Sequence, residues 1–218
     1  QGTRGSAGMV DVSTLGTIDI QGGDSGEFLN RIYTNGWTKL AIGKARYGLM
    51  LREDGIVFDD GTTSTLSEHH YFMTTTTSNA ASVLSHMEYC LKVHWPDLDV
   101  KISSVTEQWA AMAIAGPKSR DVLQRSTDGA DLSNETLPFM GVTQVVIDGI
   151  PALIFRISFS GELAYEVNVP ADYGEYVWRR IMEKGKTDNI TPYGTEAMAI
   201  MRIEKGHVAG GELDGRTT

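Results

Sequence analysis

Two Asp-Gly pairs between apolar runs constrain the fold of this chain more than any other feature. Asp54-Gly55 lies between the runs 46–51 and 56–63, and Asp148-Gly149 lies between 145–147 and 152–158. Asp-Gly favours the tight turns that join antiparallel strands, because both residues tolerate the positive φ angles that such turns need. We therefore predict two β-hairpins, one in each half of the chain.

The remaining periodicity predicts further strands and several helices. Strands are expected at 10–20, 71–77, 109–115 and 164–169, where β-branched, aromatic or alternating apolar residues dominate. Helices are expected after Asp24-Ser25, from Asn79 through residue 92, from Pro117 to Gln124, after Asp172, and at 195–205. This order predicts an α+β fold with mixed, mainly antiparallel sheets and packed helices. No Gly-x-Gly-x-x-Gly stands between a strand and a helix, so the Rossmann fingerprint is absent.

Composition and charge narrow the classes of function. The 218 residues are 41% hydrophobic, which is enough to bury a core, and carry a formal net charge of −9. The acidic balance argues against nucleic-acid partners, which require a basic face, and no apolar run reaches the ~20 residues that span a bilayer. The one cysteine, Cys90, forms no intrachain disulfide, which suits a reducing cytoplasm. His86 and His94 lack the spacing of metal ligands, so we expect no metal site.

The first hairpin also carries a candidate chemical pair. Tyr47 precedes Asp60 by thirteen residues, with the turn between them. This spacing can bring a phenol and a carboxylate to one end of a small sheet, where the carboxylate accepts a proton or stabilises a cation. Turn chemistry alone also explains such a run, because paired Asp residues after a strand are often solvated. The sequence leaves open whether Asp59 or Asp60 is the functional side chain.

Several segments together resemble the folate-binding aminomethyltransferase family, which includes the glycine-cleavage T-protein and a domain of the alpha subunit of heterotetrameric sarcosine oxidase. The segments are 11–16 (Asp-Val-Ser-Thr-Leu-Gly), 28–35 (Phe-Leu-Asn-Arg-Ile-Tyr-Thr-Asn), 45–60, 113–118, 158–166 (Ser-Phe-Ser-Gly-Glu-Leu-Ala-Tyr-Glu) and 201–215. They run from near the first residue to near the last, and their joint order is more specific than any one of them. The ending 204–215 favours the sarcosine oxidase branch.

The resemblance implies a tetrahydrofolate site. In relatives, a Tyr and an Asp thirteen residues apart border the reactive folate nitrogens, and Tyr47 and Asp60 match them. A Glu that ends the family's Gly-Glu-x-x-Tyr/Phe-Glu motif binds the pterin ring, and Glu166 occupies that place. One carboxylate can accept hydrogen bonds from both the amino group and the ring N–H of a pterin edge. Without the resemblance, Glu166 reads as an ordinary outward-facing Glu.

The chain departs from the family pattern in two respects. The transferases carry Ala-Arg-Asp where this chain has Ala197-Met198-Ala199, so that Arg contact is missing. Arg202 is kept four residues later and is a further candidate folate contact, although a helix-surface charge explains it as well. Residues 1–218 also match only the folate-binding domain of the family. We therefore expect a fragment without the C-terminal barrel domain and the flavin- and dinucleotide-binding parts, inactive alone.

The resemblance implies a function in one-carbon metabolism. The chain would be the tetrahydrofolate-binding domain of a sarcosine oxidase alpha subunit, capturing the one-carbon unit of oxidised sarcosine as 5,10-methylenetetrahydrofolate. Asp60 and Tyr47 would be catalytic and, with Glu166 and Arg202, would bind the folate. Flavin and NAD are expected only elsewhere in the parent enzyme, whose other domains and subunits are the expected partners. A stand-alone aminomethyltransferase and a non-catalytic folate-binding or assembly module remain alternatives.

Overall fold

Both Asp-Gly pairs form the hairpins that the sequence predicts. In the computed structural model, which describes residues 1–209 and 212–213, Asp148 and Gly149 alone join β8 (Val142–Ile147) to β9 (Ile150–Phe155). Both turn residues have positive φ angles, 48° and 81°, as a two-residue hairpin turn requires. The other hairpin has a longer turn, in which Gly55 has a φ of 81°.

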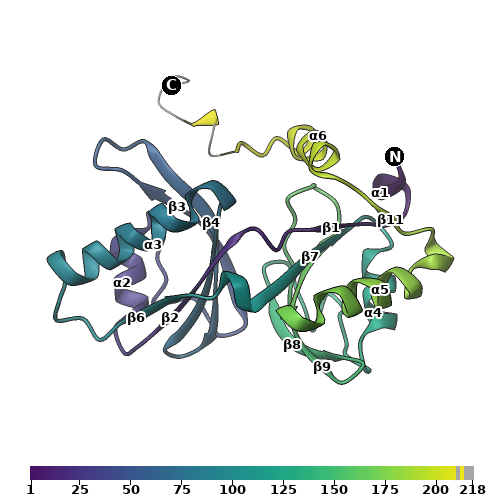
Figure 1. Cartoon of the computed structure of the whole chain (residues 1–218), viewed down its shortest axis with the longest axis horizontal. Helices are drawn as coiled ribbons and strands as arrows, with labels where there is room; N and C mark the ends of the chain where they lie inside the picture. Colours follow the sequence, from purple (N-terminus) through teal and green to yellow (C-terminus); the bar gives the residue numbers. More distant parts are fainter. Residues whose placement is uncertain (210–211, 214–218) are drawn as a thin grey trace. The chain divides into compact units, whose positions relative to one another are not determined.

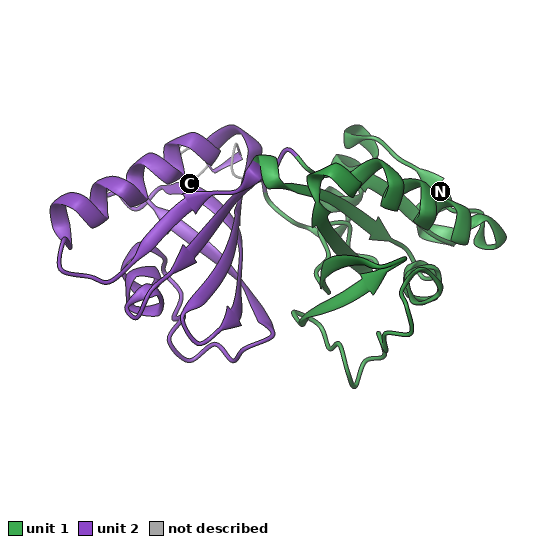
Figure 2. Ribbon diagram, turned by 60° about the horizontal axis from the view of Figure 1, so that its bottom comes forward, with its two compact units in different colours: residues 1–13, 107–208 green, residues 14–106, 209–218 purple. Residues whose placement is uncertain are grey.

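The chain divides into two compact units, each with its own sheet (Figures 1 and 2). Unit 1 consists of Gln1–Ser13 and Glu107–Val208, and unit 2 consists of Thr14–Thr106 with the described residues after Val208. The strands pair antiparallel, except that β1 and β11 are parallel. The fold is therefore α+β with mainly antiparallel sheets, as predicted.

Unit 1 is a sheet with two of its helices packed on one face. Its strand order is β11-β1-β7-β10-β9-β8. Besides β8 and β9, its elements are α1 (Gly2–Gly5), β1 (Gly8–Asp11), β7 (Trp109–Ala115), α4 (Ser119–Ser126), β10 (Ala164–Pro170), α5 (Gly174–Lys184), β11 (Thr191–Pro192) and α6 (Thr195–Lys205), with short 3₁₀ turns at Thr106–Gln108, Ala171–Tyr173 and Lys186–Asp188. Tyr165 and Val167 of β10 join Val122 of α4 and Ile181 of α5 in one core. Because side chains alternate along a strand, Glu166 lies on the opposite face of this sheet.

Unit 2 is a second sheet with its own core. Its strand order is β3-β4-β5-β2-β6. Its elements are β2 (Gly16–Gln21), α2 (Ser25–Ile32), β3 (Lys44–Leu51), β4 (Val57–Ser67), β5 (His70–Thr75), a 3₁₀ turn (Thr77–Asn79), α3 (Ala80–Tyr89), a π-helical turn (Cys90–His94) and β6 (Lys101–Ser104). Phe28 of α2 and Met87 of α3 pack against Ile20 and Met73 of the sheet. The helices therefore bury one face of the sheet.

The prediction of one strand at 10–20 is wrong. β1 ends at Asp11 and β2 begins at Gly16, and the two strands belong to different sheets. The Asp11 carboxylate accepts hydrogen bonds from the backbone N (2.9 Å) and the hydroxyl (2.6 Å) of Ser13, a local turn that competes with a strand. The polar residues within the alternating pattern therefore end one strand instead of continuing it.

Helix starts were predicted near the right places, but for the wrong reason. Asp24 and Asn79 stand where N-caps were expected, yet neither makes a side-chain capping bond. Asp24 Oδ2 accepts from Asp99 N (2.8 Å), and Asn79 Nδ2 donates to Phe58 O (2.9 Å). The predicted cap at Asp172 lies in a 3₁₀ turn before α5. Asp24 and Asn79 therefore connect distant segments instead of capping their own helices.

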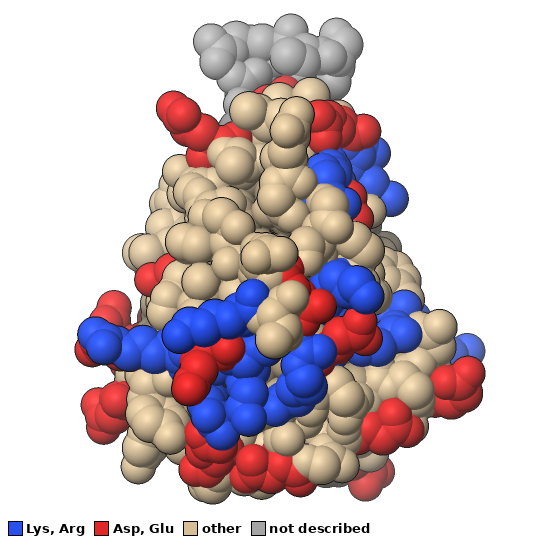
Figure 3. All heavy atoms as spheres, turned by 90° about the vertical axis from the view of Figure 1, so that its right-hand side faces the viewer, with Lys and Arg blue, Asp and Glu red and all other residues tan. Residues whose placement is uncertain are grey.

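Basic and acidic side chains alternate on the surface of unit 1. Arg125 pairs with Asp188, and Arg179 pairs with Glu175. Figure 3 shows one face on which lysines and arginines lie among acidic residues. An exposed pair such as Arg179–Glu175 contributes only about 0–1 kcal/mol, so it adds little to the stability of the fold. In the part of the chain that the structure describes, no helix is long and apolar enough to cross a membrane.

Candidate functional site

Tyr47 and Asp60 lie together, as their spacing predicts. In the β3–β4 pairing, Tyr47 is opposite Thr62 and Asp60 is opposite Leu49, so the two are diagonal neighbours on one face. Tyr47 Oη donates to Asp60 Oδ2 (2.9 Å). Burial, followed by the hydrogen bond to this carboxylate, raises the pKa of Tyr47. The phenol therefore stays protonated and serves as a donor.

The second carboxylate oxygen of Asp60 is the chemically open atom of this pair. Oδ1 is buried and has no hydrogen-bond partner among the described residues. A buried acceptor without a donor is unfavourable, typically by about 1–3 kcal/mol, and such atoms often mark a place that a ligand or water fills. Asp60 Oδ1 is therefore suited to accept a hydrogen bond or a proton from a bound molecule.

The structure distinguishes the two adjacent aspartates. Asp59 is buried, and its carboxylate accepts hydrogen bonds from Thr76 Oγ1 (2.6 Å), Thr76 N (3.2 Å) and Asn79 Nδ2 (3.3 Å). Burial raises the pKa of Asp59 despite these bonds. Asp59 thus fastens β4 to the segment between β5 and α3. Of the two carboxylates, Asp60 is the one with an unused acceptor.

Two glycines let β3 and β4 carry this pair. Gly48 follows Tyr47 and is opposite Gly61, which follows Asp60. A Cβ on Gly48 would come within 2.8 Å of Trp37 Cζ2 and 2.9 Å of Tyr33 Cδ1, closer than packed atoms allow. The absent side chain therefore lets two aromatic rings pack directly against the strand that holds Tyr47.

Glu166 lies in unit 1, on the sheet face opposite α4 and α5. In the neighbouring strands it is opposite Ala113 of β7 and Phe155 of β9, so its surroundings are apolar. The side chain is only partly exposed, and burial raises the pKa of Glu166 to about 7. It therefore changes charge near neutral pH, unlike the ordinary exposed Glu that its residue type suggests.

The Gly-Glu motif before Glu166 builds the loop that leads into β10. Ser158 Oγ donates to Glu162 O (2.6 Å) and accepts from Gly161 N (3.0 Å), and Gly161 has a φ of 81°. Glu162 pairs with Arg4 Nη1 (2.6 Å), while Arg4 Nη2 contacts Glu204 Oε2 of α6 (2.5 Å). Glu162 of the motif therefore connects, through Arg4, to α1 and α6. Glu166, its last residue, is the one whose pKa is strongly raised.

Arg202 lies on α6 and is partly buried. Its Nη1 donates to His207 O (3.0 Å), just beyond the end of its own helix. Arg202 thus contributes to the end of α6, and a role toward a ligand stays a prediction. Tyr47 and Asp60 belong to unit 2, whereas Glu166 and Arg202 belong to unit 1.

Sequence reasoning missed two residues near Glu166. Asn168, two residues along β10 on the same face, is buried. Tyr193 lies close enough for the Glu166 charge to contribute to its pKa, which burial and this charge raise to about 12. Tyr193 directly follows β11, a strand of two residues, and so short an element leaves no detectable periodicity.

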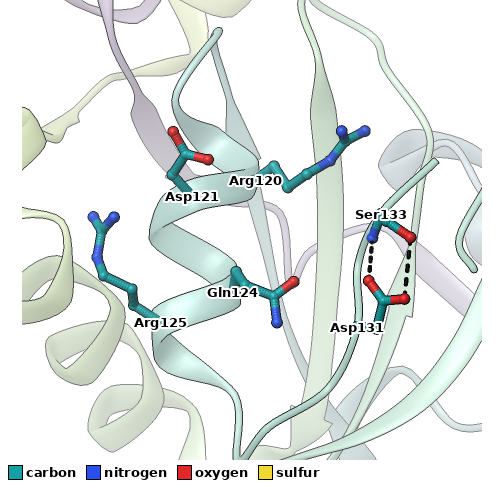
Figure 4. A pocket seen from close by; sticks show the side chains of 6 residues that line it. All are labelled: Arg120, Asp121, Gln124, Arg125, Asp131 and Ser133. Carbon is teal, nitrogen blue, oxygen red and sulfur yellow. Dashed lines mark hydrogen bonds between the residues drawn. The ribbon is translucent and has the colours of Figure 1, made fainter.

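An open depression of about 390 Å³ lies beside α4, and none of the predicted site residues lines it (Figure 4). It is lined by Arg120, Asp121, Gln124, Arg125, Asp131 and Ser133. Its charges are already engaged, since Arg125 pairs with Asp188 and Arg120 Nη2 donates to Asn134 Oδ1 (2.6 Å). Among the described residues, no group of His, Cys, Asp and Glu is arranged to hold a metal ion.

Comparisons with known proteins identify relatives over the whole chain. The model of the GCVT N-terminal domain family matches residues 1–218. The chain is 55% identical over 214 residues to the sarcosine oxidase subunit alpha of Rhizobium meliloti (strain 1021), covering 97% of this chain and 22% of that protein. It is 32% identical over 204 residues to the aminomethyltransferase of Oceanobacillus iheyensis, covering 93% of this chain and 54% of that protein. The chain thus spans about a fifth of one relative and about half of the other.

Solved structures share the fold. The aminomethyltransferase T of the glycine cleavage system from Bartonella henselae superposes with a TM-score of 0.82 at 24% identity, covering 95% of this chain and 53% of that one. A chain of the heterotetrameric sarcosine oxidase from Corynebacterium sp. U-96 gives a TM-score of 0.63 at 14% identity, covering 91% of this chain and 87% of that one. At these identities the likeness establishes the fold alone.

Proposed function

The chain belongs to the GCVT N-terminal domain family, and on this premise we propose that it is the tetrahydrofolate-binding domain of a sarcosine oxidase alpha subunit. The identity to such subunits is 50–55% over nearly the whole chain, against 32% for an aminomethyltransferase. In this proposal the domain captures the one-carbon unit of oxidised sarcosine as 5,10-methylenetetrahydrofolate.

The observation that carries the catalytic part of the proposal is the unpartnered Oδ1 of Asp60. Beside a folate nitrogen, this oxygen can accept the proton that is lost when the nitrogen bonds to the one-carbon unit, and it can stabilise the positive charge that develops. Tyr47, which donates to Oδ2, holds the carboxylate in orientation. Holding the two reactants together can lower the activation free energy by up to about 7–11 kcal/mol.

Glu166 is proposed to bind the pterin ring. Its ionised carboxylate can accept hydrogen bonds from the amino group and from the ring N–H of one pterin edge. The apolar neighbours Ala113 and Phe155 strengthen such bonds because they exclude water. Arg202 is proposed as a further folate contact, since a guanidinium can pair with a carboxylate of the folate tail.

The remaining parts of the activity are proposals about the full-length protein. Flavin and NAD would be held by other parts of the enzyme, and the other domains and subunits would be the partners of this domain. A cytoplasmic location is proposed because the single cysteine, Cys90, is free and buried, and a reducing compartment suits such a thiol.

The Asp60→Asn variant of the full-length enzyme tests the proposal. Asp60 interacts most strongly as charge develops, so its loss should lower turnover more than folate affinity. We expect sarcosine oxidation to continue while methylenetetrahydrofolate output falls by at least about tenfold and formaldehyde accumulates. Unchanged methylenetetrahydrofolate output would show that Asp60 has no catalytic role.

A stand-alone aminomethyltransferase is the second candidate, favoured by the 32% identity to the aminomethyltransferase of Oceanobacillus iheyensis over 93% of this chain. The two candidates differ in the donor of the one-carbon unit. Sarcosine oxidation by the full-length protein supports the oxidase, whereas transfer only from an aminomethyl-carrying protein supports the transferase. Folate binding without either reaction would identify a non-catalytic folate-binding or assembly module.

A further inference from the structure

Tyr193 lies in the same row of the unit 1 sheet as Glu166. β11 pairs with β1 so that Met9 is opposite Pro192, and Tyr193 N donates to Met9 O (3.0 Å). Val10, the next residue of β1, is opposite Ala113 of β7, and Ala113 is opposite Glu166. Residues in one row across a sheet point to the same face. Val10 and Ala113, which separate Tyr193 from Glu166, are small.

The ring of Tyr193 lies over this face. A Cβ built on Gly8, which is two residues before Val10 and shares its face, would come within 2.7 Å of Tyr193 Cδ1. Glycine at position 8 therefore makes room for the aromatic ring. The phenol is partly buried. Burial, followed by the negative charge of Glu166, raises the pKa of Tyr193 to about 12, so the two side chains are close enough to interact electrostatically.

The hydroxyl of Tyr193 and the carboxylate of Glu166 are near but not bonded to each other. Among the described residues, no hydrogen bond joins them. At a pKa of about 12 the phenol keeps its proton at neutral pH, so it can donate. Along this row the acceptor and the donor stand on either side of two apolar residues, Val10 and Ala113.

This arrangement complements one edge of a 4-oxo pterin. That edge presents an amino group, a ring N–H and a carbonyl oxygen on neighbouring atoms, which is a donor–donor–acceptor pattern. A carboxylate satisfies the two donors, and a phenol beside it satisfies the carbonyl. A 4-amino pterin presents a donor in place of the carbonyl. Its neighbouring ring nitrogen also carries no proton, so it gives the carboxylate only one donor and gives the phenol no carbonyl oxygen to bind, and the site therefore favours the oxo compound.

We propose that Tyr193 is a specificity-determining residue that donates to the carbonyl oxygen of a 4-oxo pterin whose neighbouring donors are bound by Glu166. This inference rests on the proposed folate-binding function and extends it to a choice between two pterin classes. A purely packing role for Tyr193 would require only its ring against Gly8. Removing the hydroxyl while keeping the ring therefore distinguishes the specificity role from the packing role.

The Tyr193→Phe variant keeps the ring and removes the hydroxyl. Affinities for tetrahydrofolate and for its 4-amino analogue are measured by calorimetry on the full-length protein, unmodified and variant. We expect the variant to bind tetrahydrofolate about fivefold more weakly, the usual effect of one neutral hydrogen bond, with little change for the 4-amino analogue. Tyr173→Phe, at an exposed tyrosine of the same unit, is the matched control and should change neither affinity.

Other outcomes overturn the inference in distinguishable ways. Suppose that Tyr193→Phe weakens the binding of both ligands equally, or of neither, while Glu166→Gln still weakens the binding of tetrahydrofolate. Then Tyr193 does not bind the carbonyl oxygen, and the proposed function stands. If the unmodified protein binds neither pterin, the proposed function is wrong and the inference falls with it. The hydroxyl of Tyr193 makes no hydrogen bond within the described chain, so we expect Tyr193→Phe to fold normally. Thermal melting of each variant checks this.

Discussion

Two adjacent aspartates show how residue identity alone leaves function undecided. Asp59 and Asp60 have the same chemistry and lie in the same strand, but alternation directs them to opposite faces. Asp59 meets donors from Thr76 and Asn79, whereas Asp60 meets Tyr47 and keeps one free oxygen. The thirteen-residue spacing was enough to predict the pair with Tyr47. It did not reveal which carboxylate was already satisfied, because the donors come from a distant segment.

Asp59 is predicted to serve stability. Asp59→Ala removes a buried carboxylate and leaves the partly buried donors of Thr76 and Asn79 without this acceptor, which should lower the free energy of unfolding by about 2–4 kcal/mol. The matched variant Asp60→Ala loses one bond to an exposed tyrosine and should cost less than about 1 kcal/mol. Urea unfolding of both variants measures the difference. Equal losses would contradict the division of roles between the two aspartates.

At the scale of elements, the sequence predicted the strands and helices well, but it did not predict the long-range hydrogen bonds that connect them. The hairpins at Asp54-Gly55 and Asp148-Gly149 are confirmed, as is the helix at 195–205, because turn chemistry and periodicity are local signals. The expected caps at Asp24 and Asn79 instead bind remote backbone groups. Such long-range hydrogen bonds depend on tertiary packing, which no local pattern encodes.

Arg4 connects α6 to the rest of unit 1 through hydrogen bonds and ion pairs. Its guanidinium donates to Glu162, Glu204, Ser160 O (3.0 Å) and Met201 O (3.3 Å). One side chain therefore connects the loop 158–162 to α6, the helix that carries Arg202. Nothing in the sequence around Arg4 predicts this role. The positions that it joins are about 160 and 200 residues away along the chain.

We predict that Arg4→Ala loosens α6 without unfolding unit 1. Amide hydrogen exchange within Thr195–Lys205 should accelerate about tenfold, because local opening no longer breaks these hydrogen bonds. Arg179→Ala, which removes an exposed pair with Glu175, is the control and should leave exchange in α6 unchanged. If Arg4→Ala has no more effect on α6 than the control, the contacts of Arg4 carry little energy.

At the scale of the whole molecule, each unit has its own sheet and its own core. The order of strands and helices predicted the fold class, and the resemblance predicted the family to which the chain belongs. The division into two units was not apparent from composition, because 218 residues suit one domain or two. The proposed roles fall in both units, with Glu166 in one and Asp60 in the other.

The raised pKa of Glu166 gives the folate proposal a pH signature. The carboxylate accepts from both pterin donors only when it is ionised, and its pKa is about 7 in the folded protein. Below pH 7 the neutral form dominates, so affinity should fall with falling pH, and above pH 7 it should level off. Between pH 8 and pH 6 this predicts a loss of about tenfold.

Calorimetric titration of the full-length protein with tetrahydrofolate at pH 6, 7 and 8 therefore tests the central claim most directly. We predict saturable binding that strengthens about tenfold from pH 6 to pH 8. In Glu166→Gln, binding should be weaker by about 1–3 kcal/mol at pH 8 and nearly independent of pH. Absence of saturable binding at pH 8 by the folded protein, or equal affinity and pH dependence in Glu166→Gln, would contradict the account.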